Sequence, residues 1–134
     1  MDLVNSLKPA ILTIPGIGHL SAANIISEFG DFSRFKRPSK MLAFAGLEPS
    51  SFQSGTYESS GKMVKHGSPY LRYALMNCCL PLINSDIVFA DYYAKKRSEG
   101  KPYRVALTHV AKKLLRVIYT IQTKNVPYDR SLIR

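Results

Sequence analysis

Residues 14–30 read IPGIGHLSAANIISEFG and place a tight glycine turn directly before a helical segment. Gly16 and Gly18 allow the backbone to turn sharply, because a residue without a Cβ adopts positive φ at little cost. Small and apolar residues then recur at helical spacing from Ser21 until Gly30, a residue typical of a helix end. Before the turn, Val4 to Thr13 is expected to form a short helix or helical turn. This pattern predicts a helix-hairpin-helix motif over about 9–30.

Further helices are predicted on the C-terminal side of this motif, each with start or stop signals in the sequence. Pro69, Asp86 and Pro102 are suited to the starts of three of them, and Gly100 to a stop. Pro81 is expected to kink or shorten the end of its helix. The predicted spans are Ser39 to Ala45, Pro69 to about Leu82, Ile87 to about Ser98, and Pro102 to about Thr123.

Two segments lack helical periodicity. Residues 48–67 are rich in Ser and Gly and are expected to form an ordered loop or a short hairpin. The tail from Pro127 onward is expected to be frayed. We therefore predict an all-α, compact single domain over 1–134, with the helix-hairpin-helix at about 9–30, a Ser-Gly loop at about 48–67 and a helical remainder over 68–124.

Positive charge is abundant and segregated along the chain. Lys and Arg number 19 against 9 for Asp and Glu, which gives a formal net charge of +10 over 134 residues. No acidic residue lies between Glu58 and Asp86, or between Glu99 and Asp129. Such segregation is typical of a surface that binds nucleic-acid phosphates, although a solvated basic surface or one that meets acidic lipid has the same composition.

The lack of a recognisable targeting signal and the two adjacent cysteines are typical of an intracellular protein. Apolar runs fall short of the ~18 to 20 residues of a membrane span, and the N-terminus does not resemble a signal peptide, so we predict a cytoplasmic location without membrane contact. Cys78 and Cys79 are adjacent in an apolar helical run. This spacing is poorly suited to a mutual disulfide or to metal chelation, so we interpret both as reduced core residues.

The glycine turn and the cations are the candidate phosphate-binding groups. Amide N–H groups of Gly16, Ile17 and Gly18 are expected to be free at a helix N-terminus, where they can receive a phosphate; the alternative is a tight turn that binds nothing. Lys62, Lys65 and Arg72 are further candidates, and Lys112 and Lys113 weaker ones, against the alternative of solvated surface charge.

Ordered short motifs along the chain resemble the C-terminal domain of bacterial insertion-sequence transposases of the 110/116/902 group, relatives of the Piv-type DNA invertases. The motifs are IPGIG at 14–18, EFGDFSRF at 28–35, AFAGLEP at 43–49, QSG at 53–55 and KHGSPYLRYAL at 65–75. The later KKLL at 112–115 is also similar to the closing helix of that family.

This resemblance implies a two-part recombinase. Its N-terminal half would be a RuvC-like nuclease fold with acidic metal ligands, where Mg²⁺ is expected, and no cofactor is expected in this chain. The serine of the family's Ser-Gly motif, which is thought to attack the DNA backbone, corresponds to Ser54, with Ser59 and Ser60 as rivals. Where many relatives have Ser-Lys-Arg-Gly, this chain has Val64-Lys65-His66-Gly67, so one cation is weaker at neutral pH.

Three hypotheses follow. In the first, the chain is a DNA-binding, serine-bearing transposase domain that does not recombine DNA by itself, because its 9 acidic residues are scattered and make no convincing two-metal cluster. Its partners would be DNA, a guide RNA, the RuvC-like N-terminal domain of the same transposase and, in a homo-oligomer, further copies. In the second, it is a non-enzymatic helix-hairpin-helix module that binds nucleic acid. The third, a dimerisation module, is disfavoured by the segregated charge.

Overall fold

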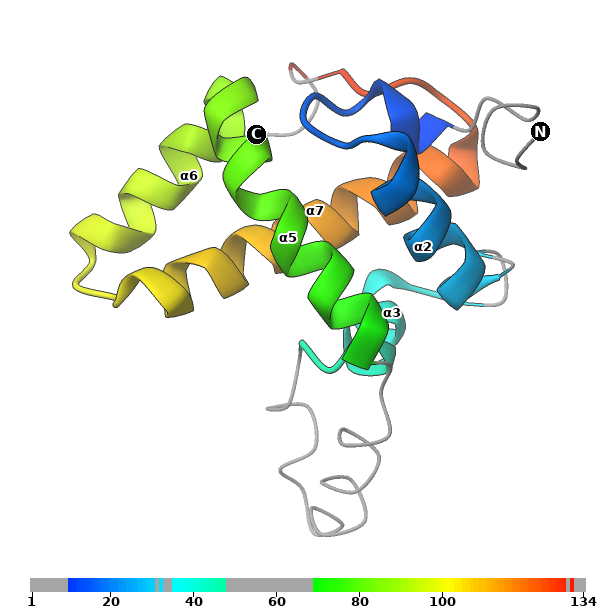
Figure 1. Cartoon of the computed structure of the whole chain (residues 1–134), viewed down its shortest axis with the longest axis horizontal. Coiled ribbons are helices and arrows are strands. Elements are labelled where there is room, and N and C mark those ends of the chain that lie inside the picture. The colour runs from blue at the N-terminus through cyan, green and yellow to red at the C-terminus, as the bar shows by residue number, and fades with distance from the viewer. Residues whose placement is uncertain (1–9, 31, 33–34, 48–68, 130, 132–134) are drawn as a thin grey trace, which may run out of the picture.

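The structure is a computed structural model that describes residues 10–30, 32, 35–47, 69–129 and 131, and this part of the chain contains helices and no strand (Figure 1). The all-α prediction is therefore confirmed. The elements are the 3-10 helix η1 (Ala10–Thr13), α2 (His19–Phe29), α3 (Pro38–Phe44), α5 (Pro69–Ser85), α6 (Ile87–Ser98) and α7 (Tyr103–Lys124).

Helix α7 is the centre of the packing. It contacts η1, α3, α5 and α6, and it crosses α5 in Figure 1. Its buried residues recur at steps of three and four, which places them on one broad apolar face. They are Ala106, Val110, Ala111, Leu114, Leu115, Val117, Ile118 and Ile121. Complete burial of each of the larger ones contributes about 1.5–3 kcal/mol, so α7 supplies a large part of the stability of the core.

Long-range hydrogen bonds join α7 and the residues after it to the first part of the chain. The backbone N–H of Ile11 donates to Gln122 Oε1 at 2.8 Å, and the hydroxyl of Tyr119 donates to the carbonyl oxygen of Phe35 at 2.9 Å. Beyond the helix, the N–H of Tyr128 donates to Thr13 Oγ1 at 2.7 Å, and its ring lies 6.4 Å from that of Phe89. The prediction of a frayed tail is therefore wrong for this residue, because its ring packs against the core.

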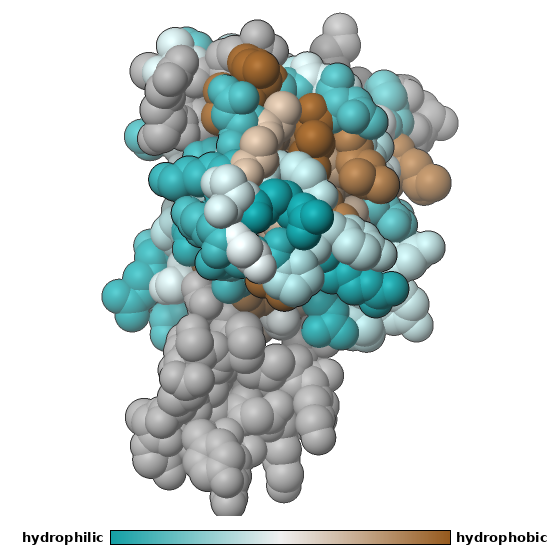
Figure 2. Space-filling model, turned by 90° about the vertical axis from the view of Figure 1, so that its left-hand side faces the viewer, coloured by the Kyte–Doolittle hydropathy of each residue, from teal (hydrophilic) through white to brown (hydrophobic). Residues whose placement is uncertain are grey.

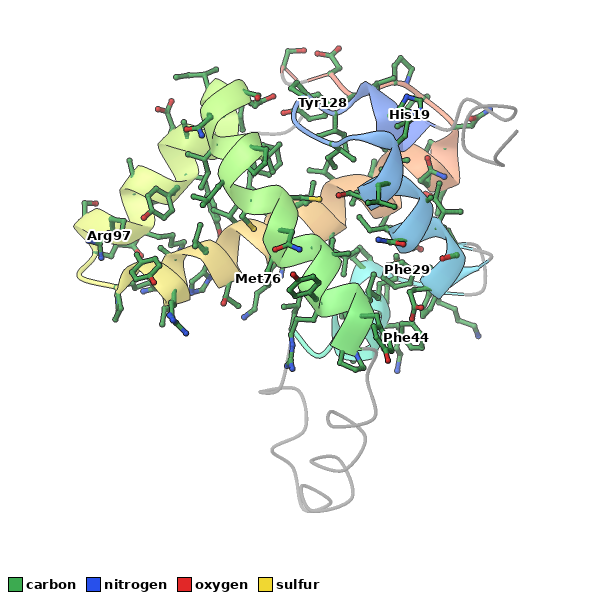
Figure 3. All side chains as sticks on the ribbon, viewed as in Figure 1. His19, Phe29, Phe44, Met76, Arg97 and Tyr128 are labelled. Carbon is green, nitrogen blue, oxygen red and sulfur yellow. The ribbon has the colours of Figure 1, made fainter. Side chains whose placement is uncertain are left out.

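A cluster of phenylalanines fixes the end of α2 against α3. Phe29 and Phe44 approach each other with ring centroids 5.6 Å apart (Figure 3). Phe35 lies between them in sequence and packs on both, at 5.5 Å from Phe29 and 5.6 Å from Phe44. Aromatic pairs at these distances add about 0.5–1.5 kcal/mol each beyond their buried area.

Most predicted helix ends are found where the sequence signals stand. Pro38 occupies the first turn of α3, Gly30 follows α2 with φ of +71°, and Oδ1 of Asp86 accepts the N–H of Val88 at 2.8 Å at the start of α6. Pro81 is an exception, because α5 continues through it to Ser85. The last turn of α5 is stabilised by Leu82, whose side chain is buried. The backbone carbonyl oxygen of Leu82 accepts the N–H of Asp86 at 2.9 Å.

Both cysteines lie buried in α5 and are free, as predicted. Burial raises the pKa of the Cys79 thiol to about 12 and also raises that of Cys78. A thiol reacts as its thiolate, so neither side chain is suited to redox or nucleophilic chemistry in the folded protein.

The surface on the side of the α6–α7 turn is mainly hydrophilic, with hydrophobic residues gathered in its upper part (Figure 2). Leu80 and Ile87, near the junction of α5 and α6, are both more than half exposed. Among the described residues, no single helix is long and apolar enough to cross a bilayer, and α5 and α6 satisfy length and composition together only as a pair bent by 107°.

Candidate nucleic-acid interface

A groove of about 760 Å³ lies between the first halves of α5 and α7. Three cations line it, Arg72 from α5 and Arg104 and Lys112 from α7, and none of the described residues that line it is acidic. Tyr73, Met76 and Tyr103 add aromatic and apolar surface to the same walls. The groove therefore combines positive charge with apolar surface.

Helical spacing explains why α7 presents these cations together. Arg104, Thr108 and Lys112 recur at steps of four, so they share one face of α7 and line the same wall. The Thr108 hydroxyl donates to the carbonyl oxygen of Arg104 at 3.0 Å, which satisfies it locally. Arg72 lies in the first turn of α5 and is exposed. Crossing of the two helices brings Arg72 and Lys112, both predicted phosphate ligands, to one groove.

Tyr103 orients the guanidinium of Arg104. Nε of Arg104 donates to the Tyr103 hydroxyl oxygen at 3.4 Å, and its Cζ lies 5.9 Å from the Tyr103 ring centroid. This hydrogen bond raises the pKa of Arg104, which carries its charge at any physiological pH. A guanidinium can engage two phosphate oxygens, so Arg104 is suited to the same task as Arg72.

The glycine turn lies against the C-terminal end of α5. Gly16 has φ of +88°, and a Cβ at this position would lie 2.9 Å from the backbone atoms of Pro81 and Leu82. The N–H of Ile17 donates to the carbonyl oxygen of Ile14 at 3.3 Å, and the Ile17 side chain is buried. The expectation of a free amide is therefore wrong for Ile17, because the turn itself uses that group.

Gly18 keeps an open environment at the start of α2. It precedes the helix as its N-cap residue, and a Cβ there would meet no atom within 4 Å. The described residues before the turn form a short 3-10 helix rather than an α-helix, so the helix-hairpin-helix interpretation stays a prediction. Any phosphate at this turn would meet the exposed side of Gly18 and His19.

Turn and groove lie at opposite ends of α5. Arg72 belongs to its first turn, whereas Gly16 packs on Pro81 and Leu82 near its last. At a rise of 1.5 Å per residue, Arg72 and Leu82 are separated by about 15 Å along the helix axis. The two candidate sites would therefore bind different phosphates.

Lys113 does not share the surface of Lys112. Its Nζ lies 4.9 Å from the ring centroid of Tyr92 on α6, in a separate hollow, and burial lowers its pKa. Consecutive helix positions point about 100° apart, so two neighbouring lysines can serve different faces. The structure therefore groups Lys112 with Arg72 and separates it from Lys113.

Cations also crowd the turn between α6 and α7. Oε1 of Glu99 lies 3.6 Å from Nζ of Lys96 and 3.3 Å from Nζ of Lys101. Burial lowers the pKa of His109, and the nearby charge of Lys112 and of other lysines lowers it further. His109 is therefore largely neutral at neutral pH.

Ser54, Lys62 and Lys65 lie outside the described residues, so their roles stay predictions. Leu47 and Pro69 are the described residues on either side of the segment that carries them, and both line the groove. The chain thus leaves and re-enters the described fold at the groove. Among the described residues, no three His, Cys, Asp or Glu side chains are grouped so that they could hold a metal ion.

Three candidate ligands in the groove were not predicted from the sequence. Tyr73, Tyr103 and Arg104 were not among the candidate ligands, yet all three line it. One signal was available, because Arg104 stands four positions before Thr108 and so extends the polar stripe of α7. For the tyrosines there was none, because the two walls of the groove come from helices distant in sequence.

A comparison with protein families decides the affiliation of the chain. The model described as the transposase IS116/IS110/IS902 family matches residues 8–94. This chain belongs to that transposase family. The resemblance inferred from the short motifs is therefore confirmed.

Individual relatives of this transposase chain are distant and longer. It is 26% identical over 123 residues to an uncharacterized 43.6 kDa protein of insertion element IS110 from Streptomyces coelicolor, covering 92% of this chain and 30% of that protein. It is 26% identical over 131 residues to the pilin gene-inverting protein of Moraxella bovis, covering 96% of this chain and 41% of that protein. It is also 26% identical over 123 residues to the transposase of insertion sequence IS1111A from Coxiella burnetii, covering 92% of this chain and 32% of that protein.

The chain thus spans between 30% and 41% of the length of these relatives. No solved structure matches it significantly.

Proposed function

We propose that this chain is the nucleic-acid-binding part of a transposase and that it holds DNA through phosphate contacts in the α5–α7 groove. One observation carries the proposal: Arg72, Arg104 and Lys112 converge on a groove with no acidic residue among its described lining. Contacts of this kind fix the position of the DNA without reading its sequence. Membership of a transposase family makes DNA the expected partner.

The serine chemistry belongs to the same proposal. The hydroxyl oxygen of Ser54 would attack a DNA phosphorus and form a serine–phosphate bond while the bond to the departing DNA oxygen breaks on the opposite side; the serine loses its proton and the departing oxygen gains one. Cations of the groove would neutralise the charge that develops on the phosphate. A RuvC-like N-terminal domain with Mg²⁺ would supply the metal chemistry and a guide RNA the choice of site, so this chain alone would bind but not recombine.

A salt series with matched charge variants tests the groove. The affinity of the chain for a short DNA duplex would be measured from low to moderate salt for Arg72→Gln/Lys112→Gln and for Lys40→Gln/Lys124→Gln. Both variants lose two positive charges, but Lys40 and Lys124 are exposed and do not line the groove. We expect only the first variant to make the negative slope of log K against log salt less steep, by about two, because each phosphate contact contributes about −0.9.

Equal effects of the two variants would show that only net charge matters, and would refute the groove as the binding site. No binding at low salt by the unaltered chain would refute the binding of duplex DNA by this part of the transposase.

The glycine turn is a second candidate site because Gly18 is open to solvent at a helix N-terminus. Gly18→Asp and Gly18→Asn are matched variants, since both residues are good N-caps and only aspartate adds a negative charge. If the turn binds phosphate, Gly18→Asp should weaken DNA binding more than Gly18→Asn does. Similar affinities for the two variants would remove the turn from the interface.

Ser54→Ala in the full-length transposase tests the nucleophile. Recombination should be abolished while DNA binding is retained, because the hydroxyl is needed for attack and not for affinity. Ser59→Ala and Ser60→Ala serve as controls. Loss of recombination in Ser59→Ala or Ser60→Ala instead would assign the nucleophile to that serine, and unchanged recombination in all three variants would favour the alternative in which the chain is a binding module only.

A further inference from the structure

Two tyrosines of the groove have no role in the hydrophobic core. Tyr73 on α5 is 70% exposed and Tyr103 on α7 is 52% exposed. Single exposed aromatic residues are common on protein surfaces, but two that line one groove from different helices are a shared surface. This surface is suited to a ligand with flat, apolar faces.

Each wall of the groove carries a tyrosine next to an arginine. On α5 the pair is Arg72 and Tyr73, and on α7 it is Tyr103 and Arg104. In the second pair the guanidinium lies beside the ring, with Nε 3.4 Å from the tyrosine hydroxyl. A ring and a cation in this arrangement match a nucleotide, whose flat base is joined to a charged phosphate.

Apolar side chains complete the lining. Met76 lies on the side of α5 that faces α7 (Figure 3), and both Met76 and Leu107 are partly buried in the groove wall. The volume of about 760 Å³ falls within the roughly 300–1,000 Å³ of clefts that enclose small organic ligands. Paired duplex bases stack on one another and keep their faces covered, so only an unpaired base can use such a surface.

We propose that the α5–α7 groove binds an unpaired stretch of nucleic acid, with bases stacked on Tyr73 and Tyr103 and phosphates held by Arg72, Arg104 and Lys112. This inference rests on the proposed function and specifies its substrate as single-stranded. The strand is either DNA opened during recombination or an unpaired segment of RNA, since stacking and phosphate contacts are common to both.

Fluorescence anisotropy with short labelled oligonucleotides tests the proposal on the whole chain. The probes are a single strand of thymidine nucleotides, a single strand of uridine nucleotides, a DNA strand of equal length with abasic sites throughout, and a duplex. The abasic strand keeps the phosphates and removes the bases. The protein variants are Tyr73→Ala/Tyr103→Ala, Tyr73→Phe/Tyr103→Phe, and Tyr70→Ala as a control that is 76% exposed and does not line the groove.

We expect the double alanine variant to bind both base-containing single strands at least about 25-fold more weakly, because each of the two stacked bases contributes a factor of about 5 to 100. The double phenylalanine variant and Tyr70→Ala should bind nearly as tightly as the unaltered chain. The abasic strand should bind weakly to every variant, because it has no base to stack. The ratio of the affinities for the two base-containing strands then identifies DNA or RNA as the better ligand.

Two results would overturn the proposal in distinguishable ways. If the alanine variant and the abasic strand bind as well as their references while Arg72→Gln/Lys112→Gln still weakens binding, the groove binds phosphates only, and the proposed function stands without the stacking. If no probe binds at low salt, the proposed function fails together with this inference.

Discussion

Replacement of Gly16 by alanine is expected to destabilise the fold more than the same replacement at Gly100. The two glycines have nearly the same φ, +88° and +91°, so each substitution places an alanine in the left-handed region at a cost of about 1–2 kcal/mol. Only at Gly16 would the new Cβ lie 2.9 Å from backbone atoms of Pro81 and Leu82; at Gly100 it would meet nothing within 4 Å. Overpacking of this kind costs about 1–3 kcal/mol more.

The free energy of unfolding should therefore fall by about 2–5 kcal/mol in Gly16→Ala and by about 1–2 kcal/mol in Gly100→Ala. Urea denaturation followed by helical circular dichroism measures both, with equal m-values as the check that only stability has changed. Equal losses in the two variants would refute the close packing of the glycine turn on α5. The positive φ of Gly16 alone would then account for a glycine at this position.

Three further outcomes can be checked with the same protein. Asp86→Ala should lose about 1–2 kcal/mol of unfolding free energy and Asp86→Asn clearly less, because Oδ1 of Asp86 accepts the N–H of Val88 at 2.8 Å and asparagine can replace that cap; equal losses would contradict the capping role. His109 has a lowered pKa in the folded protein, chiefly through burial, so the unfolded chain binds its proton more readily. Stability should therefore be complete above the usual pKa of 6.5 and decrease as the pH falls through it, and urea titrations should show a smaller decrease in His109→Gln. Cys78 and Cys79 should react with a thiol reagent near pH 8 only after unfolding, because burial raises both pKa values; rapid reaction of the native protein would contradict their burial.

Much of the fold could be predicted because its helices carry local signals. The bounds of α6 follow from Asp86, which caps the start of the helix, and from Gly100, whose positive φ is typical of the residues that end a helix. Pro81 shows the limit of such rules, because α5 continues through it where tertiary packing of Leu82 and the following cap hold the last turn. Local chemistry predicts that a helix can end, and packing decides whether it does.

The candidate site was predicted less completely, for a physical reason. Arg72 and Lys112 could be chosen from charge alone, but that they share a groove depends on the crossing of α5 and α7. Lys113 was grouped with Lys112 because they are neighbours in sequence, although the helix turns one toward the groove and the other toward Tyr92. For Ile17 the residue type gave no sign that its amide would bond within the turn.

The hydrogen bonds that tie Ile11 to Gln122 and Tyr119 to Phe35 also govern how the protein can be made. They join residues 111 and 84 positions apart, so they can form only after most of the chain has been synthesised. During synthesis at about 5–20 residues per second, η1 emerges roughly 5–20 seconds before α7, the helix against which it packs. For that interval the apolar faces of the nascent chain are open to chaperones, and the domain closes only when α7 has left the ribosome.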